Sequence, residues 1–218
     1  MTDQKIQSIR RVITGHDKEN RAVVKIDDFA SNHQRGAGVN NTLIWSSDEM
    51  PIEIWSDEDY GSREVGVQPP TRGTCIRYID IMPGNPREQQ RTDTLDYVMC
   101  LSGEIDLELD NGVTKHLQAG DFIVQQATNH SWLNRGTESC RLAVVMLDSK
   151  KRPVVGNPSP PRMRPHDGNG LTPDPPLQRL VTKNNSDGKS VVAWEGIASN
   201  HKWSGRGMVA TLIWSTDE

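Results

Sequence analysis

The 218-residue sequence lacks the features that mark several classes of protein. It has no run of about eighteen apolar residues, which a membrane-spanning helix requires, and its N-terminal segment has no apolar stretch typical of a secretion signal. Its 25 Lys and Arg against 29 Asp and Glu give a net charge of -4, without a concentrated basic face for phosphate binding. We therefore expect a soluble, cytoplasmic protein that binds neither membranes nor nucleic acid.

Cysteine is scarce, and helical periodicity is nearly absent. The three cysteines follow no metal-ligand spacing and lie among apolar or strand-like neighbours, so we expect Cys75, Cys100 and Cys140 to be buried free thiols. A hydrophobic content of 34% and a mean hydropathy of -0.65 are low for a chain that is compact throughout. Part of the chain is therefore expected to be surface, loop or linker.

Short alternating segments, broken by turns, fill the chain between Arg21 and Leu147. Residues 75–81 (CIRYIDI) and 104–110 (EIDLELD) alternate in a way that is typical of a sheet with one buried face. The sequence DNG at 110–112 suits the left-handed backbone of a tight turn. These segments predict an all-β fold, an antiparallel sandwich or barrel, that forms one module over residues 1–148.

The composition of the sequence changes after this module. Eight of the 13 prolines lie between Pro153 and Pro176. This density predicts an extended, semi-rigid linker over residues 149–176.

A segment from the first module returns after the linker. Residues 23–49 (VVKIDDFASNHQRGAGVNNTLIWSSDE) recur as 191–218 (VVAWEGIASNHKWSGRGMVATLIWSTDE), with ASNH and TLIWS unchanged. Residues 177–218 are therefore interpreted as the opening part of a second module. Such a part cannot bury its apolar residues by itself, so we expect it to lie against a barrel, its own or a neighbour's, in a place equivalent to that of residues 23–45, and to favour a homodimer. A disordered tail is the alternative.

The strongest functional signal is a pair of motifs at 84–103 and 120–134. Their spacing resembles that of the cupin superfamily over roughly residues 10–148, and especially the small single-domain cupins of fungal and bacterial polyketide pathways. The resemblance implies an antiparallel double-stranded β-helix, or jelly-roll, barrel in which three histidines and a glutamate surround a divalent metal. The matching positions in this sequence are Gly84, Gln90, Thr92, Asp96, Gly103, His130 and Asn134.

Departures from the family motif change the expected chemistry. Gln90 and Thr92 stand where the family has histidines, and Asp96 stands where it has a glutamate. A catalytic first-row metal needs about three good protein ligands, and His130 is the one imidazole left. We therefore favour a site without a metal or other cofactor. A metal, if bound, would be Fe, Mn, Ni or Zn held by His130, Asp96 and Gln90.

The remaining carboxylate and imidazole suit acid-base chemistry. We expect His130 to act as a base and Asp96 to act as its orienting partner or as the acid. An internal hydrogen-bonded pair with no catalytic role is the alternative. Strand parity and the aromatic content of the motifs add expected substrate-binding residues, although the two aromatic ones suit barrel packing as well: Gln90, Thr92, Thr94, Tyr97 and Trp132.

Three functions stay open at this point. The favoured one is a lyase or isomerase that acts on a small, carbonyl-bearing, polyketide-like metabolite by dehydration, isomerisation or cyclisation. The second is a metal-dependent oxidoreductase or dioxygenase, the activity that the resemblance implies most often. The third is a non-catalytic ligand-binding or assembly module.

Overall fold

The computed structural model describes residues 8–150, 176–199, 201–203 and 209–215. Most of the predicted linker at 149–176 lies outside these residues. Strands make up nearly all of the regular secondary structure in the described part of the chain, with one short 3-10 element beside them, which confirms the all-β prediction. It contains no helix long and apolar enough to cross a membrane.

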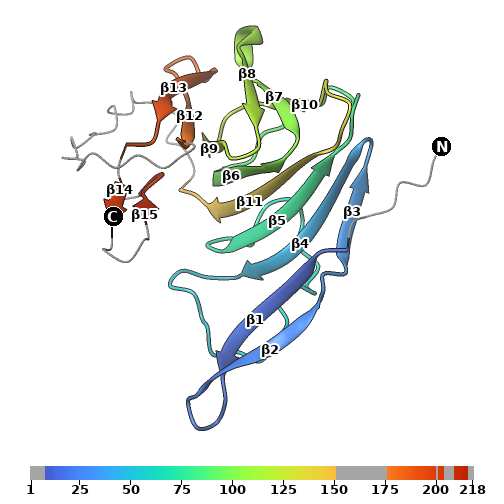
Figure 1. The fold of residues 1–218 in the computed structure, drawn as a ribbon, viewed down its shortest axis with the longest axis vertical. Helices are drawn as coiled ribbons and strands as arrows, with labels where there is room; N and C mark the ends of the chain where they lie inside the picture. Colours follow the sequence, from blue (N-terminus) through green and yellow to red (C-terminus); the bar gives the residue numbers. More distant parts are fainter. Residues whose placement is uncertain (1–7, 151–175, 200, 204–208, 216–218) are drawn as a thin grey trace.

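Two sheets form the barrel (Figure 1). The larger has the order β13-β12-β9-β6-β11-β5-β4-β3, and the smaller has the order β10-β7-β8. The strands of the larger sheet are β3 (Asn32–Gly36), β4 (Val39–Ser47), β5 (Thr74–Ile81), β6 (Thr94–Ser102), β9 (Phe122–Gln126), β11 (Cys140–Asp148), β12 (Gln178–Asn184) and β13 (Ser190–Ile197). Those of the smaller sheet are β7 (Glu104–Glu108), β8 (Thr114–Gln118) and β10 (Ser131–Leu133).

Two further pairs of strands lie outside these sheets. They are β1 (Arg10–His16) with β2 (Ala22–Phe29), and β14 (His201–Trp203) with β15 (Val209–Thr211). Figure 1 shows the β1–β2 hairpin at the opposite end of the molecule from β12 and β13. The pairings of the barrel strands are antiparallel, except that β12 runs parallel to β9.

Period-two alternation builds the core between the two sheets. Every second residue of β7 and β11 is buried, which places Ile105, Leu107 and Leu142 in one apolar cluster. Cys75, Cys100 and Cys140 are free and buried, as the sequence predicted. The DNG turn is confirmed as a short 3-10 element at Asp110–Gly112, whose last two residues have φ of 60° and 73°.

Asn134, the last residue of the second motif, ties the ends of several strands together. Its side-chain Nδ2 donates to the carbonyls of Ile81 and Glu138, both at 2.8 Å, and its Oδ1 accepts the Gly136 amide at 3.0 Å. The side chain is buried, so these bonds satisfy polar groups that water does not reach. The motif asparagine therefore positions the segment that carries His130.

The C-terminal repeat lies against its own barrel, where β12 extends the larger sheet at the edge of β9. This place is not equivalent to that of the first copy, because β2 pairs with β1 in a separate sheet and β4 lies near the other edge of the larger sheet. The expectation of equivalent placement is therefore wrong. The two copies share local structure and differ in what they pack against.

Candidate active site

A cavity of about 280 Å³ lies inside the barrel. Strands β4, β5, β6, β9 and β11 contribute to its wall, together with the segments around Gln90 and His130. Its main apolar lining residues are Ile79, Ile81, Val98, Trp132, Val144 and Met146. Its polar lining residues include Asn41, Arg77, Asn85, Glu88, Gln90, Thr92, Asp96, Gln125 and His130.

The structure brings five of the predicted site residues to this one cavity, namely Gln90, Thr92, Asp96, His130 and Trp132. The two motifs meet through backbone hydrogen bonds between Gln90 and His130, with N···O distances of 2.8 and 3.0 Å in the two directions. Gln90 is exposed and His130 is buried, so the first lies towards solvent and the second lies deeper. The spacing read from the sequence therefore located the cavity.

Thr94 and Tyr97 do not line the cavity. The Thr94 hydroxyl donates to Thr92 Oγ1 at 2.7 Å, so Thr94 hydrogen-bonds a lining residue without lining the cavity itself. Tyr97 directly follows Asp96 on β6, and side chains alternate between the two faces of a strand. Its predicted role in substrate binding therefore does not apply to this cavity.

His130 is oriented by a backbone carbonyl. Its Nδ1 lies 3.0 Å from the Thr128 carbonyl oxygen, and because a carbonyl only accepts, Nδ1 carries the hydrogen and Nε2 keeps its lone pair. The prediction that Asp96 orients the imidazole is therefore wrong. Burial lowers the pKa of His130 below its ordinary value, against the opposing effect of the Thr128 hydrogen bond, so the neutral imidazole is favoured.

Asp96 is a buried carboxyl without a charged partner in its hydrogen bonds. The residue is 4% exposed, and burial raises the pKa of its carboxyl from 3.8 to about 6 against the opposing effect of the neighbouring Thr94 and Thr92 hydroxyls. Oδ2 accepts from the Thr92 hydroxyl at 3.4 Å, a long contact, and Oδ1 has no hydrogen-bond partner. Asp96 therefore exchanges its proton in the range where many enzymes operate.

Two polar residues of the cavity were missed from the sequence, namely Arg77 and Gln125. Arg77 Nη1 donates to Asn41 Oδ1 at 3.1 Å and Nη2 donates to the Gly66 carbonyl, both neutral acceptors, while Nε has no partner. Gln125 is the cross-strand neighbour of Asp96, and its Nε2 also has no partner. A signal for Arg77 existed, because it shares strand parity with buried apolar residues in CIRYIDI.

Comparison with known proteins agrees with this architecture. Residues 77–146 match the family model described as "Cupin domain". The cupin-domain-containing oxidoreductase virC of Hypocrea virens is 35% identical over 156 residues, which is 67% of this chain and 78% of the relative. The chain belongs to the cupin family.

Other relatives of this cupin come from fungi as well. The phomopsin biosynthesis cluster protein C' of Diaporthe leptostromiformis is 31% identical over 160 residues, 69% of this chain and 84% of the relative. The cupin-domain-containing oxidoreductase fogC of Aspergillus ruber is 32% identical over 152 residues, 66% and 74% of the two chains. Among solved structures, the Schizosaccharomyces pombe Cnp3 cupin domain aligns with 64% of this chain and 88% of its own, with a TM-score of 0.40 and 10% identity.

The donor set of this cupin does not fit the metal that the family implies. The described residues hold no group of three or more His, Cys, Asp or Glu side chains placed to bind a metal ion. The cavity supplies one imidazole and one carboxyl whose raised pKa reflects weak stabilisation of its anion. Gln90 and Thr92 offer neutral oxygens, which are poor ligands for first-row transition metals. We therefore derive no chemical step through a metal.

Asp96→Asn is expected to raise the free energy of unfolding at pH 7. The carboxyl binds its proton more tightly when folded, with a pKa of about 6 against an ordinary 3.8, so stability falls as pH rises through this window. The loss is ~3 kcal/mol at neutral pH for a group this buried, and a neutral amide avoids it. Urea unfolding at pH 4 and pH 7 measures the difference.

The exposed Asp93 gives the matched control, because Asp93→Asn should change stability little at either pH. The gain in Asp96→Asn should be present at pH 7 and absent at pH 4. An equal gain at both values would mean that the amide improves packing and that the carboxyl is not destabilised by burial.

Proposed function

We propose that this cupin is a small-molecule enzyme of secondary metabolism that transfers protons on a carbonyl-bearing, polyketide-like substrate. One observation carries the proposal. The buried atoms Asp96 Oδ1, Gln125 Nε2 and Arg77 Nε have no protein partner, although their residues line the cavity together with His130. Unpaired buried polar groups are costly, so a polar ligand that completes them is favoured. The names of the fungal relatives support the biosynthetic setting.

The first step assigned to the site is removal of a proton from the carbon next to the substrate carbonyl. His130 Nε2 accepts the proton, since Nδ1 is committed to the Thr128 carbonyl. The electron pair of the broken C–H bond moves to the carbonyl oxygen and forms an enolate. Arg77, a buried cation with neutral hydrogen-bond partners, and Gln125, with a free amide donor, are the groups that stabilise this oxygen.

The second step returns a proton from Asp96. In a substrate with a β,γ double bond, protonation of the γ carbon of the extended enolate completes an isomerisation. Protonation of a departing β-hydroxyl instead releases water and completes a dehydration. Asp96 is suited to either step because, with a pKa of about 6, its carboxyl still holds a proton in mildly acidic solution.

The remaining lining residues define the kind of compound that fits. Ile79, Val98 and Met146 offer an apolar wall, and the Trp132 ring lies edge-on to His130 with centroids 5.7 Å apart and planes at 69°. Gln90 and Thr92 add neutral polar groups to the lining. A partly hydrophobic compound with clustered oxygens matches this surface better than a sugar or a highly charged metabolite.

A metal-dependent oxidoreductase is the second candidate function. Several relatives carry the name "cupin-domain-containing oxidoreductase", and this favours it. In this chain the metal would have to be held by His130, Asp96 and Gln90. The donor set described above argues against that arrangement, and so proton transfer is the better-supported chemistry.

His130→Ala is expected to abolish most proton abstraction. Simple 1,3-dicarbonyl compounds in D₂O are the probe, because NMR follows exchange at the carbon next to the carbonyl whatever the later steps are. The wild-type protein should accelerate this exchange, and His130→Ala should lose about 10²–10⁴-fold of the rate. His116→Ala is the matched control, since His116 contacts Asp106 outside the cavity. Equal rates in wild type and His130→Ala would contradict the assignment.

The rate of isomerisation or dehydration should peak on the acidic side of neutrality. His130 must be neutral, which sets the acidic limb below its ordinary pKa of 6.5, and Asp96 must be protonated, which sets the alkaline limb near pH 6. Rates measured across pH 4 to 9 test this. Asp96→Asn should lower the rate and remove the alkaline limb, and an alkaline limb that persists in the variant would exclude Asp96 as its source.

Metal content separates the two candidate functions. Protein purified without chelator or affinity metal should contain well below one equivalent of Fe, Mn, Ni or Zn by elemental analysis, and EDTA should leave the exchange rate unchanged. About one equivalent of a metal that is lost in His130→Ala would favour the oxidoreductase.

A further inference from the structure

The hairpins β1–β2 and β12–β13 are two copies of one structural element. Their pairing registers correspond throughout, from Arg10 opposite Phe29 in the first to Gln178 opposite Ile197 in the second. Each has its register shift at the same point, after Ile13 and after Val181. The repeat therefore extends further towards the N-terminus than the sequence identity alone indicated.

The turns of the two hairpins agree as well. The Asp17 side chain accepts the amides of Glu19 and Arg21, and the Asn185 side chain accepts those of Asp187 and Lys189, all at 2.9 to 3.0 Å. The left-handed residues of the two turns, with φ of 61° and 78°, are Asn20 and Gly188. The two hairpins thus differ in their surroundings and not in their internal structure.

The second hairpin is docked on the barrel. Strand β12 runs parallel to β9, with Leu180 opposite Ile123 and Val181 opposite Val124. Leu180 is 4% exposed and Val181 is 1% exposed. The buried Thr182 hydroxyl lies 3.1 Å from that of Thr128, and the Thr182 carbonyl accepts a hydrogen bond from a β9 side chain. This edge of β9 therefore binds a hairpin of this kind.

The first hairpin leaves the same surface exposed. Val12, which corresponds to Leu180, is 48% exposed, and Val24, which corresponds to the core-packed Val192, is 58% exposed. Among the described strands β1 pairs with β2 alone, so no described strand pairs with its other backbone edge. An open strand edge flanked by apolar side chains is a surface to which another strand can add.

The residues that make the docked interface have close counterparts in the first hairpin. Ile13 corresponds to Val181, and Thr14 corresponds to Thr182 and keeps its hydroxyl. Asp27 corresponds to Glu195, whose carboxylate pairs with Lys115 of β8 in the docked hairpin at 2.5 Å. Apolar character and the hydroxyl thus carry over to the β9 edge, whereas the Asp27 carboxylate is held by Arg10 of its own hairpin at 2.7 Å.

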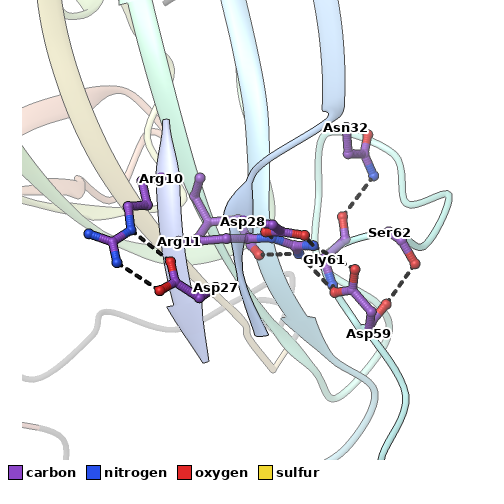
Figure 2. Close-up of polar contacts among 9 residues, drawn as sticks. Arg10, Arg11, Asp27, Asp28, Asn32, Asp59, Gly61 and Ser62 are labelled. Atoms are coloured by element: carbon purple, nitrogen blue, oxygen red, sulfur yellow. Dashed lines mark hydrogen bonds and ion pairs between the residues drawn. The ribbon is translucent and has the colours of Figure 1, made fainter. Parts of the chain in front are cut away.

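The first hairpin is held in place as a projecting arm. Figure 2 shows the buried Arg11 guanidinium between Asp28 and Asp59, at 2.7 and 2.6 Å. The loop that carries Asp59 also binds Asn32, whose Nδ2 donates to the Gly61 carbonyl at 3.3 Å.

The hairpin is also held near its turn. Lys25 forms an ion pair with Asp57 at 2.7 Å, and the centroid of the His16 ring lies 5.3 Å from that of Trp55. The hairpin is therefore fixed at both ends while Val12 stays exposed, which lowers the entropic cost of binding.

We propose that the β1–β2 hairpin is a docking arm for the β9 edge of a second copy of this chain. Two copies would exchange arms reciprocally, each β1 running parallel to the partner's β9, to form a closed two-fold dimer. The hairpin β12–β13 competes for the same edge from within the chain. Because a tethered segment has an effective concentration of about millimolar, the C-terminal hairpin keeps the edge occupied at low protein concentration.

Solution mass of full-length variants tests the proposal. Val181→Asp places a charge at a 1% exposed position and should release β12, so that the variant sediments at twice the 24.4 kDa of one chain at micromolar concentration. Val12→Asp combined with Val181→Asp should return the mass to that of a monomer. Ile197→Asp is the matched control, because this residue of the same hairpin is 45% exposed and should change neither mass nor melting temperature.

Several outcomes would overturn the proposal. One is a Val181→Asp protein that is folded by circular dichroism and stays monomeric. Another is a dimer, in wild type or variant, that Val12→Asp leaves intact. A wild-type dimer that Val12→Asp dissociates would support the proposal, because the two copies would then exchange arms without a substitution that releases β12.

A hairpin exchange tests the fit without exposing the edge. Residues 178–197 are replaced by a second copy of residues 10–29 in the full chain. If the first hairpin fits β9, the chimera should keep the melting temperature of the wild type and its resistance to proteolysis between residues 178 and 197. Cleavage there at the rate seen for Val181→Asp would show that the arm does not fit, whatever the mass measurements give.

Discussion

The pKa values of Asp96 and His130 depend on their burial inside the barrel, where neither side chain has a charged hydrogen-bond partner. An aspartate and a histidine with ordinary pKa values of 3.8 and 6.5 would differ strongly in proton affinity in water. Inside the barrel, desolvation raises the first value to about 6 and lowers the second. The two groups thus approach one another in proton affinity, so one can hold a proton while the other is free to accept one over a shared range of pH.

The same constraint explains why the cavity is not simply a packed core. If Asp96 and His130 had a purely structural role, they would be expected to hydrogen-bond each other. Instead, Asp96 bonds to Thr92, and His130 bonds to the Thr128 carbonyl. Asp96 Oδ1 stays unpaired at a cost in stability that apolar residues of similar size would avoid. Proteins keep such costs mainly at functional sites. The arrangement is therefore better explained by ligand binding than by stabilisation of the fold.

The fold and the place of the site could be predicted because both follow from local rules. Alternation in CIRYIDI and EIDLELD specifies strands with one buried face, and motif spacing brought Gln90 and Asp96 to one cavity with His130. The orientation of His130 could not be predicted, because its partner is a backbone carbonyl, and every residue has one. The role of Gln125 likewise depends on the register between β6 and β9, which the sequence does not state.

The repeat shows which structural features sequence similarity predicts and which it does not. The identical residues in the two segments predicted a second copy of the local structure, and the two hairpins agree in register, bulge and turn. Their surroundings differ because docking depends on which edge is within reach of the chain, and that is a property of the assembled barrel. Similarity therefore predicts an element more reliably than it predicts the partner of that element.

The edge of β9 links the repeat to the site. Gln125 belongs to β9 and lies opposite Asp96, while its neighbours Val124 and Gln126 contact Val181 and Thr182 of the docked hairpin. A strand paired on both sides loses backbone freedom, so whichever hairpin occupies this edge also holds the backbone that positions Gln125. The same hairpin also contacts Thr128, whose carbonyl orients His130, because the Thr182 hydroxyl lies 3.1 Å from the Thr128 hydroxyl. Removing the hairpin would therefore loosen both the backbone beside Asp96 and the segment that carries His130. The proposed assembly and the proposed chemistry thus depend on the same strand.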